Sequence, residues 1–506
     1  MKYKNPIISG FYPDPSITRV GEDYYLVTSS FAYFPGVPIF HSKDLISWEQ
    51  IGYCLSRKSQ LTLEKANISG GIYAPTIRYY DGTFYMVTTN VSDKGNFYVT
   101  SKDPRKEWSE PIYVEQGGID PSLLFDGDKV YFTSTGEVNG ISSILQSEID
   151  IVTGKILREI ECIWSGTGGR FPEAPHLYKI NDIYYLMISE GGTEYGHMIT
   201  IGRSTSPWGP FTSNPLNPIL THRNLGNSII QGTGHGDLVE AADGNWWIVF
   251  LAFRTSTQYF HHLGRETYLA PVKFNEDGWP VINDNGTVAI EMKGPLPKPY
   301  PYNNIEIRDD FNTNSLRLCW NFICNPFKEN WSLEAKASNL TLYGNPVTLS
   351  HIGSPAFVGR RQQHFNCHFK SKLEFYPKNN KDEAGITIFY DYNHHYEIGL
   401  VKIHDSKYII VRKTIGDLST IVYKESYIKD TIIFDITSDP LHYTLSYGED
   451  EETLNFASSA LTQYVSTEAT KCSFTGVYLG MYASSSGTHI STPAYFDWFD
   501  YEGMKD

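Results

Sequence analysis

The chain has 506 residues and a formal net charge of −15, and aromatic residues make up 14% of it. This length exceeds that of a single hydrophobic core and predicts two domains. The acidic balance argues against nucleic acid or an anionic membrane surface as a partner, because both bind basic patches. The excess of tyrosine and tryptophan favours a strand-rich structure and surfaces on which sugars stack.

A five-fold repeat of tyrosine-rich strands, each preceded by a turn, occupies the first part of the chain. The aromatic positions that mark it are Tyr24-Tyr25, Phe84-Tyr85, Val130-Tyr131, Tyr184-Tyr185 and Trp246-Trp247. Their spacing is near, or somewhat above, the length of one four-stranded propeller blade. We therefore predict a five-bladed β-propeller over residues 1–292.

Three acidic residues share one position within this repeat. Asp14 and Asp120 lie ten residues before their aromatic strands, and Glu173 lies eleven before its own. The same offset reaches Ala74 and His235 in the other two units. Equivalent positions in a closed ring of blades point the same way relative to the axis. The sequence thus predicts that the three acids meet at one mouth of the central channel.

Paired carboxyl groups are what glycoside hydrolysis needs, since one donates a proton to the leaving oxygen and the other activates water or attacks. A third carboxylate nearby raises the pKa of its neighbour and so keeps that neighbour protonated near neutral pH. Taken singly, each acid is more often a solvated turn residue or a scaffold acceptor. Three acids that share one phase favour the catalytic interpretation.

The second part of the chain follows a proline-dense stretch. Residues 293–306 are predicted to be the linker, because Lys293 to Pro301 is extended in tendency. Period-two alternation beyond it predicts a β-sandwich of jelly-roll, concanavalin-like form over residues 307–506. The alternating segments include Ser371–Tyr376, Gly385–Tyr390, Tyr396–Val401 and Tyr408–Lys413. Long helical periodicity is absent from the sequence, so the whole chain is predicted to be all-β.

Several motifs in order resemble glycoside hydrolase family 43. They are Tyr12-Pro13-Asp14-Pro15-Ser16, Gly71-Ile72-Tyr73-Ala74-Pro75, Gly118-Ile119-Asp120-Pro121 and Glu173-Ala174-Pro175-His176. The chain is most similar to the branch of β-xylosidases and α-L-arabinofuranosidases that carry a C-terminal β-sandwich. The resemblance implies an exo-acting hydrolase that releases terminal β-D-xylose, α-L-arabinofuranose or both from xylo-oligosaccharides and arabinoxylan fragments.

The resemblance also implies catalytic roles. Asp14 is the expected general base that activates water, and Glu173 the expected general acid. Asp120 is expected to raise the pKa of Glu173 and to orient it. The family inverts the anomeric configuration, which implies a single displacement without a covalent intermediate.

The remaining site residues are expected to bind the sugar. Arg265 matches a family arginine that contacts the acid pair and the sugar hydroxyls, and its planar fork suits that role. Phe31 and Tyr73 are expected to form the walls of the pocket, with tyrosine where relatives often have tryptophan. Ala74 leaves room for the sugar.

His235 is the candidate metal ligand. In similar enzymes the matching histidine lies under the sugar site and can hold a calcium ion or a water in the channel. Calcium prefers several oxygen ligands, so one imidazole implies a mostly hydrated ion that stimulates the enzyme, with no cofactor strictly required.

The Ser/Gly-rich segment Tyr482–Ile490 is the candidate lid of the pocket, and deleting residues 484–490 is expected to weaken activity on small substrates.

The N-terminal sequence shows no leader, so we expect a cytoplasmic enzyme that trims imported oligosaccharides. The sequence does not specify the oligomeric state.

Two other interpretations of the site remain open at this stage. Sucrose- and fructan-cleaving propellers would have an Arg-Asp-Pro motif and a catalytic Glu-Cys, whereas this chain has Ile119-Asp120-Pro121 and a Glu161-Cys162 that falls within a blade. A non-catalytic sugar-binding propeller with a lectin-like sandwich would need aromatic platforms but no paired acids. Replacing each acid in turn would separate a lectin from an enzyme.

Overall fold

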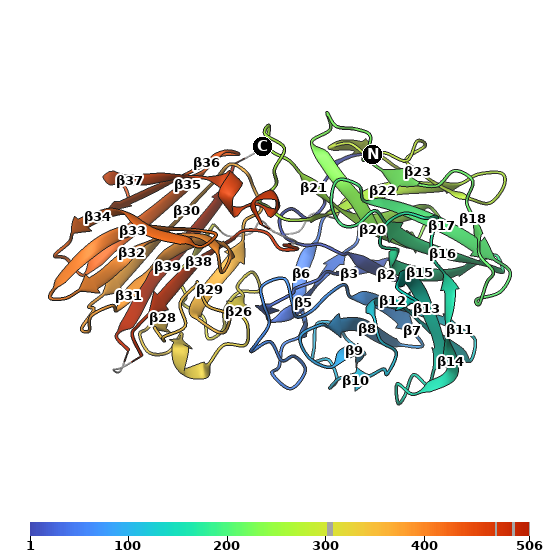
Figure 1. Ribbon diagram of the computed structural model, residues 1–506, viewed down its shortest axis with the longest axis horizontal. Helices are drawn as coiled ribbons and strands as arrows, with labels where there is room; N and C mark the ends of the chain where they lie inside the picture. Colours follow the sequence, from blue (N-terminus) through green and yellow to red (C-terminus); the bar gives the residue numbers. More distant parts are fainter. Residues whose placement is uncertain (301–306, 471–472, 488–490, 505–506) are drawn as a thin grey trace.

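The computed structural model describes residues 1–300, 307–470, 473–487 and 491–504. Figure 1 shows two parts side by side along the long axis, a ring of sheets and a pair of layered sheets. The prediction of an all-β chain is confirmed, because the helical segments of the described residues are three short 3-10 turns, η1 (Lys328–Asn330), η2 (Thr462–Val465) and η3 (Thr467–Ala469). No helix in the described ranges is long and apolar enough to cross a membrane.

The first part is a five-bladed β-propeller, counted over the described residues. Each blade is an antiparallel sheet whose strands follow one another in sequence. Blade 1 consists of β2 (Ser16–Val20), β3 (Asp23–Val27), β5 (Gly36–Ser42) and β6 (Glu49–Leu55). Blade 2 consists of β7 (Thr76–Tyr80), β8 (Thr83–Asn90), β9 (Gly95–Ser101) and β10 (Ile112–Tyr113). Blade 3 consists of β11 (Ile119–Asp126), β12 (Lys129–Val138), β13 (Ile141–Ile149) and β14 (Ile156–Trp164).

Blades 4 and 5 complete the ring. Blade 4 consists of β15 (Glu173–Ile180), β16 (Ile183–Glu190), β17 (Met198–Ser204) and β18 (Thr212–Ser213), with β19 (Leu220–Thr221) also paired to β17. Blade 5 consists of β20 (Ile230–Glu240), β21 (Trp246–Arg254), β22 (Glu266–Phe274) and β23 (Pro280–Ile282). The middle strand β21 is a nearly continuous apolar run that is buried along its length, as expected where packing covers both faces of a strand.

The ring is closed by the start of the chain. The inner strand of each blade contacts that of the next, and β20 contacts β2 again. β1 (Lys2–Lys4) pairs with β24 (Glu291–Lys293), which follows blade 5. The buried Asn5 side chain donates to the Leu269 carbonyl at 2.9 Å and accepts from the Leu269 N–H at 3.0 Å. These contacts fasten blade 1 to blade 5 and fix the five inner strands relative to one another.

The second part is a β-sandwich of two antiparallel sheets. One contains β25 (Arg308–Asp309), β27 (Trp331–Ser332), β28 (Leu340–Tyr343), β39 (Pro493–Gly503), β30 (Cys367–Phe375), β35 (Thr431–Ser438), β36 (His442–Gly448) and β37 (Leu454–Leu461). The other contains β29 (Ala356–Arg361), β38 (Tyr478–Ser484), β31 (Glu383–Asp391), β32 (His394–Ile403), β33 (Ser406–Ile415) and β34 (Leu418–Ser426). Three of the four segments predicted from alternation lie within strands of these sheets, and the fourth, Ser371–Tyr376, extends one residue beyond the end of β30.

The two domains share a hydrophobic core. Strand β38 alternates aromatic and aliphatic residues, so Leu479 and Met481 face the interior of the sandwich while Tyr478 and Tyr482 pack into a cluster that includes propeller residues. Tyr478 stacks on Tyr33 of the propeller with ring centroids 3.7 Å apart. A strand buried on both faces at the junction holds the two domains together as one rigid unit.

Polar contacts add to this junction. β4 (Tyr33–Phe34) pairs with β26 (Phe322–Ile323) across the domain boundary. The fully buried Arg361 donates from Nε to the Phe11 carbonyl at 2.6 Å and from Nη1 to Asn321 at 2.8 Å. The sandwich is therefore positioned well enough to contribute to a site on the propeller.

Candidate active site

The inner strands turn their first side chains towards the channel through a shared backbone irregularity. Asp14, Asp120, Ala174 and His235 all have positive φ, between 46° and 55°. The register between inner and second strand shifts at this point in β11, β15 and β20. Bulges of this kind re-aim side chains at sheet ends. The strict repeat position in blade 4 is therefore Ala174, and Glu173 lies one residue before it.

The predicted site residues gather in one pocket at the mouth of the channel. All eight of them line it, together with three residues that the sequence analysis did not identify, Ile119, Thr193 and Phe474. Phe474 belongs to the sandwich, whereas the other lining residues come from the propeller. The expectation that the three acids converge agrees with this geometry, and their individual roles stay predictions.

Asp14 is buried and held by several polar groups. Ser29 Oγ donates to its Oδ2 at 2.5 Å, and Arg265 Nη1 donates to its Oδ1 at 2.8 Å. His235 Nδ1 lies 3.5 Å from the same Oδ1. Buried charges in proteins are normally paired and hydrogen-bonded in this way. The carboxylate is thereby fixed in orientation, as a general base must be.

The Asp120 carboxyl group is influenced by the charges of both other acids. Its pKa is raised well above the usual range, mainly because the side chain is buried and next because of the negative charges of Glu173 and Asp14. The Ala174 N–H donates to its Oδ2 at 3.2 Å, which ties Asp120 to the residue after Glu173. Burial and the neighbouring carboxylates therefore favour the protonated form of Asp120.

Glu173 has a partner that the sequence did not reveal. The Nε2 atom of His197, a fully buried residue of blade 4, lies 3.2 Å from Glu173 Oε1. A Cβ on Gly234 would lie 2.2 Å from the His197 ring, so glycine beside His235 is what admits this imidazole. A glycine often occurs where another group packs closely against the backbone. The sequence around Gly234 does not indicate that this group is His197.

An aromatic wall closes the pocket on the sandwich side. Phe474 lies 6.0 Å from both Phe31 and Tyr73 between ring centroids, and Phe31 lies 5.3 Å from Tyr73. Arg265 Nη2 donates to the Phe474 carbonyl at 3.2 Å while Nη1 also donates to Thr193 Oγ1 at 2.9 Å. Arg265 thus connects the general-base candidate, blade 4 and the sandwich.

The described residues of the predicted lid do not line the active-site pocket. Tyr482 to Ser484 belong to strand β38, and Ser484 to Ser486 line a different pocket on the sandwich. Residues 488–490 lie outside the described residues. The segment that reaches the active site surrounds Phe474, and it passes so close to the propeller that a Cβ on Gly476 would lie 2.4 Å from the Leu263 carbonyl. Which segment covers the pocket depends on this packing of the sandwich against the propeller. The serine and glycine content of a segment does not predict such packing.

The donors around His235 do not fit a protein-held calcium ion. Among the described residues no group of three or more His, Cys, Asp or Glu side chains is arranged to hold a metal. Burial lowers the pKa of His235, and its nearest carboxylate, Asp14, already accepts from Arg265. Calcium prefers six to eight oxygen ligands. No catalytic step is therefore assigned to a metal.

Three acids in one pocket of a closed ring of blades, capped by an attached sandwich, supply the paired carboxyl groups that a glycoside hydrolase needs. Comparison with known families agrees. Residues 3–280 match the family described as Glycosyl hydrolases family 43, and residues 308–502 match the Beta xylosidase C-terminal Concanavalin A-like domain. The chain therefore belongs to glycosyl hydrolases family 43, and the predicted fold and enzyme class are confirmed.

Full-length relatives support this assignment. The chain is 42% identical to a non-reducing end alpha-L-arabinofuranosidase of Bacteroides ovatus, covering 99% of this chain and 94% of the relative. It is 39% identical to a xylosidase/arabinosidase of Butyrivibrio fibrisolvens, with 98% and 99% covered. The solved structure of Bacteroides ovatus Xyloglucan PUL GH43B superposes with a TM-score of 0.95 at 41% identity, over 100% of both chains.

Proposed function

We propose that this glycosidase removes single β-D-xylose or α-L-arabinofuranose units from the non-reducing ends of xylo-oligosaccharides and arabinose-substituted fragments. The observation that carries the proposal is the capped pocket, in which Phe474 of the sandwich faces Phe31 and Tyr73 across from the three acids. A pocket closed on one side receives a chain end rather than the middle of a chain. The two relatives described above bear names that refer to these same two sugars.

The proposed mechanism is a single displacement with inversion. Asp14 takes a proton from water as the water attacks the anomeric carbon, and Glu173 gives a proton to the leaving oxygen. Arg265 and Ser29 hold Asp14 for this step, while His197 lies against Glu173. Asp120 accepts from the Ala174 N–H, one residue after Glu173, and this contact orients the acid. This assignment needs no metal ion.

The test compares turnover of the nitrophenyl β-D-xylopyranoside and α-L-arabinofuranoside, followed by xylo-oligosaccharides. We expect monosaccharide as the first product from the oligosaccharides, because the capped pocket admits one terminal sugar. Early release of longer oligosaccharides would contradict the exo assignment. Proton NMR of the first-formed anomer should show inversion, and net retention would overturn the role of Asp14 as base. Binding without turnover of any of these substrates would favour the lectin interpretation.

A further inference from the structure

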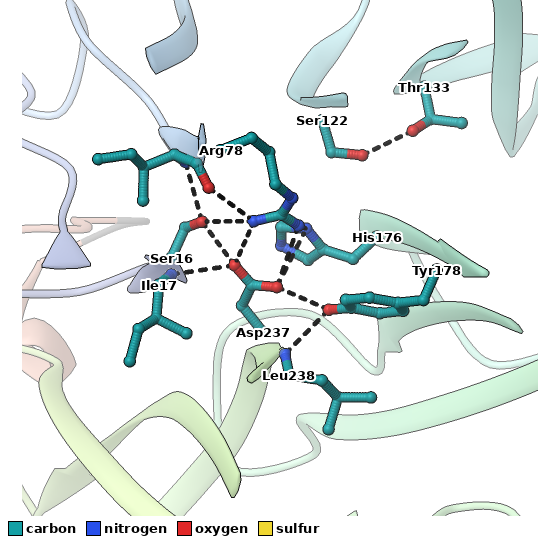
Figure 2. Close-up of polar contacts among 10 residues, drawn as sticks. Ser16, Ile17, Arg78, Ser122, Thr133, His176, Tyr178, Asp237 and Leu238 are labelled. Atoms are coloured by element: carbon teal, nitrogen blue, oxygen red, sulfur yellow. Dashed lines mark hydrogen bonds and ion pairs between the residues drawn. The ribbon is translucent and has the colours of Figure 1, made fainter. Parts of the chain in front are cut away.

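A second ring of polar side chains lies directly beneath the acids in the channel. On each inner strand, the residue two positions after the shared repeat position points to the same face of the sheet. Four of these positions hold Ser16, Ser122, His176 and Asp237. The remaining inner strand, β7 of blade 2, carries Arg78 four positions after Ala74, and the long Arg78 side chain enters the same layer. Figure 2 shows Ser16, His176 and Asp237 around the Arg78 guanidinium, with Ser122 apart from them beside Thr133.

Arg78 and Asp237 form a two-pronged ion pair. Arg78 Nη1 lies 2.8 Å from Asp237 Oδ2, and Nη2 lies 3.1 Å from Oδ1. The Asp237 side chain is fully buried and that of Arg78 is 17% exposed. Asp237 also accepts from Ser16 Oγ at 2.6 Å, the Ile17 N–H at 3.0 Å and Tyr178 OH at 2.7 Å. The acceptor positions of this carboxylate are well occupied, which is the condition under which a buried ion pair is stable.

Arg78 Nη2 also contacts a residue of blade 4. Nη2 donates to His176 Nδ1 at 2.9 Å. Burial lowers the pKa of His176 to about 3, with the Arg78 charge acting in the same direction against the opposing effect of Asp237. Arginine has no acceptor, so this nitrogen of the neutral imidazole must be the acceptor. Arg78 Nη1 also donates to Ser16 Oγ at 3.3 Å, so one guanidinium contacts side chains of β2, β15 and β20.

Those three strands carry the groups whose separation matters for catalysis. Ser16 follows Asp14 by two residues, His176 follows Glu173 by three, and Asp237 follows His235 by two. An inverting site must keep a gap for water between base and acid. A rigid planar fork that touches strands of both acids is suited to fix that gap. The third acid is separate in this layer, because Ser122 bonds Thr133 of its own blade at 2.6 Å.

This network also explains the poor fit for calcium. Arg78 donates to both carboxylate oxygens of Asp237, at 2.8 Å and 3.1 Å, and Ser16 Oγ donates to Oδ2 at 2.6 Å. The carboxylate that a channel cation would need is therefore already paired with a cation of the protein itself. A divalent ion added beside it would meet a fixed positive charge.

We propose that Arg78 is a positioning residue that serves as the fixed cation of the channel, sets the separation of Asp14 and Glu173, and makes a divalent ion unnecessary for hydrolysis. The inference rests on the proposed function, because the kinetic experiments that test it need a glycoside that the enzyme cleaves. Arg78 itself does not line the sugar pocket.

The first arm of the test removes and adds metal. Wild-type enzyme dialysed against EDTA is assayed on the better nitrophenyl glycoside, with and without calcium chloride. We expect the same kcat and KM in both cases. Loss of most activity in EDTA with recovery in calcium would overturn the proposal. Failure of wild-type enzyme to cleave any glycoside under either condition would instead refute the proposed function.

The second arm replaces Arg78. In Arg78→Ala we expect kcat to fall by about 100-fold with KM changed by less than about threefold, because misplacing catalytic groups by about 1 Å has that effect. Guanidinium chloride at concentrations too low to unfold the protein should restore at least a tenth of the wild-type kcat, because it can refill the vacated position. Arg78→Lys keeps the charge without the fork and should lose about tenfold, without rescue.

A matched control separates positioning from simple stability. Arg412 in the sandwich pairs with Glu383 and Glu397 at 2.7 Å each, far from the catalytic ring in the fold. Arg412→Ala should lower Tm, keep kcat, and show no kinetic response to guanidinium. Thermal melting of Arg78→Ala with and without guanidinium provides a readout that needs no turnover, and we expect a rise in Tm. Wild-type kcat in Arg78→Ala, or equal kcat losses in the two alanine variants, would overturn the proposal.

Discussion

The propeller and the sandwich contribute different things to one pocket. The propeller supplies the charged groups, with Asp14, Asp120 and Glu173 held by Arg265, Ser29 and His197. The sandwich supplies Phe474, an apolar ring with a backbone carbonyl that accepts from Arg265. The difference teaches that catalytic chemistry is built within a single domain, whereas the shape of the pocket is completed across the domain boundary. Substitutions in the two regions should therefore affect kcat and KM differently.

The largest effect is expected from the acids of the propeller. Asp14→Ala and Glu173→Ala should each lower kcat by about 10²–10⁴-fold, the usual contribution of a positioned acid or base. Steady-state kinetics on the nitrophenyl glycosides measures this. Asp126→Ala provides a matched control, because Asp126 bonds Lys179 and Tyr184 outside the pocket. Residual activity above a tenth of wild type in either acid variant would contradict the assigned roles.

Arg265→Ala should affect both regions at once. It removes a partner from the buried Asp14 and the contact to the Phe474 carbonyl. Leaving a buried carboxylate without its cation costs about 3 kcal/mol or more of folding stability. We expect a lower Tm, a lower kcat and a higher KM together. A variant with unchanged KM would show that Arg265 does not influence the aromatic wall.

Asp120→Asn should lower kcat and raise the stability of the fold at neutral pH. The folded-state pKa of Asp120 is raised by burial and by the charges of Glu173 and Asp14, so its contribution to stability is present below the unfolded pKa near 4 and is lost as pH rises through the folded value. Asparagine does not ionise and keeps an oxygen for the Ala174 N–H. The Tm of the variant minus that of wild type should therefore grow from pH 4 to pH 8, while kcat falls. A difference independent of pH would contradict the shift.

Phe474→Ala isolates the contribution of the sandwich. We expect KM for small substrates to rise by about fivefold with a smaller change in kcat, since an aromatic contact of this kind is worth about 1 kcal/mol. The control is Phe456→Ala, an exposed phenylalanine on the outer strand β37. Equal behaviour of the two variants would show that Phe474 does not contribute to substrate binding.

The smallest effect is expected at the segment first predicted to be the lid. Ser485→Ala and Ser486→Ala should leave kcat and KM unchanged within about twofold, because surface substitutions away from a site have little energetic effect. Both serines line the separate sandwich pocket. A rise in KM comparable to that of Phe474→Ala would restore the original lid hypothesis.

The sequence by itself determined the repeat, the strands and the shared phase of Asp14, Asp120 and His235. These are local properties, because alternation and turn residues act over a few neighbours. It placed Glu173 at the same phase, although the backbone equivalent is Ala174. The family motifs then supplied expected roles for residues that the structure brings into a single pocket.

Only the tertiary structure decided what surrounds those residues. Phe474, Thr193 and His197 carry no periodic or motif signal. Arg265 meets Phe474 and Thr193 across 209 and 72 residues of sequence, and the His197 ring packs against Gly234. Arg78 follows Ala74 by only four residues, yet its part in the channel depends on Asp237 and His176 from two other blades. The reason is physical: strand patterns specify which face a side chain occupies, whereas bulges, ring closure and domain packing specify which side chain it meets.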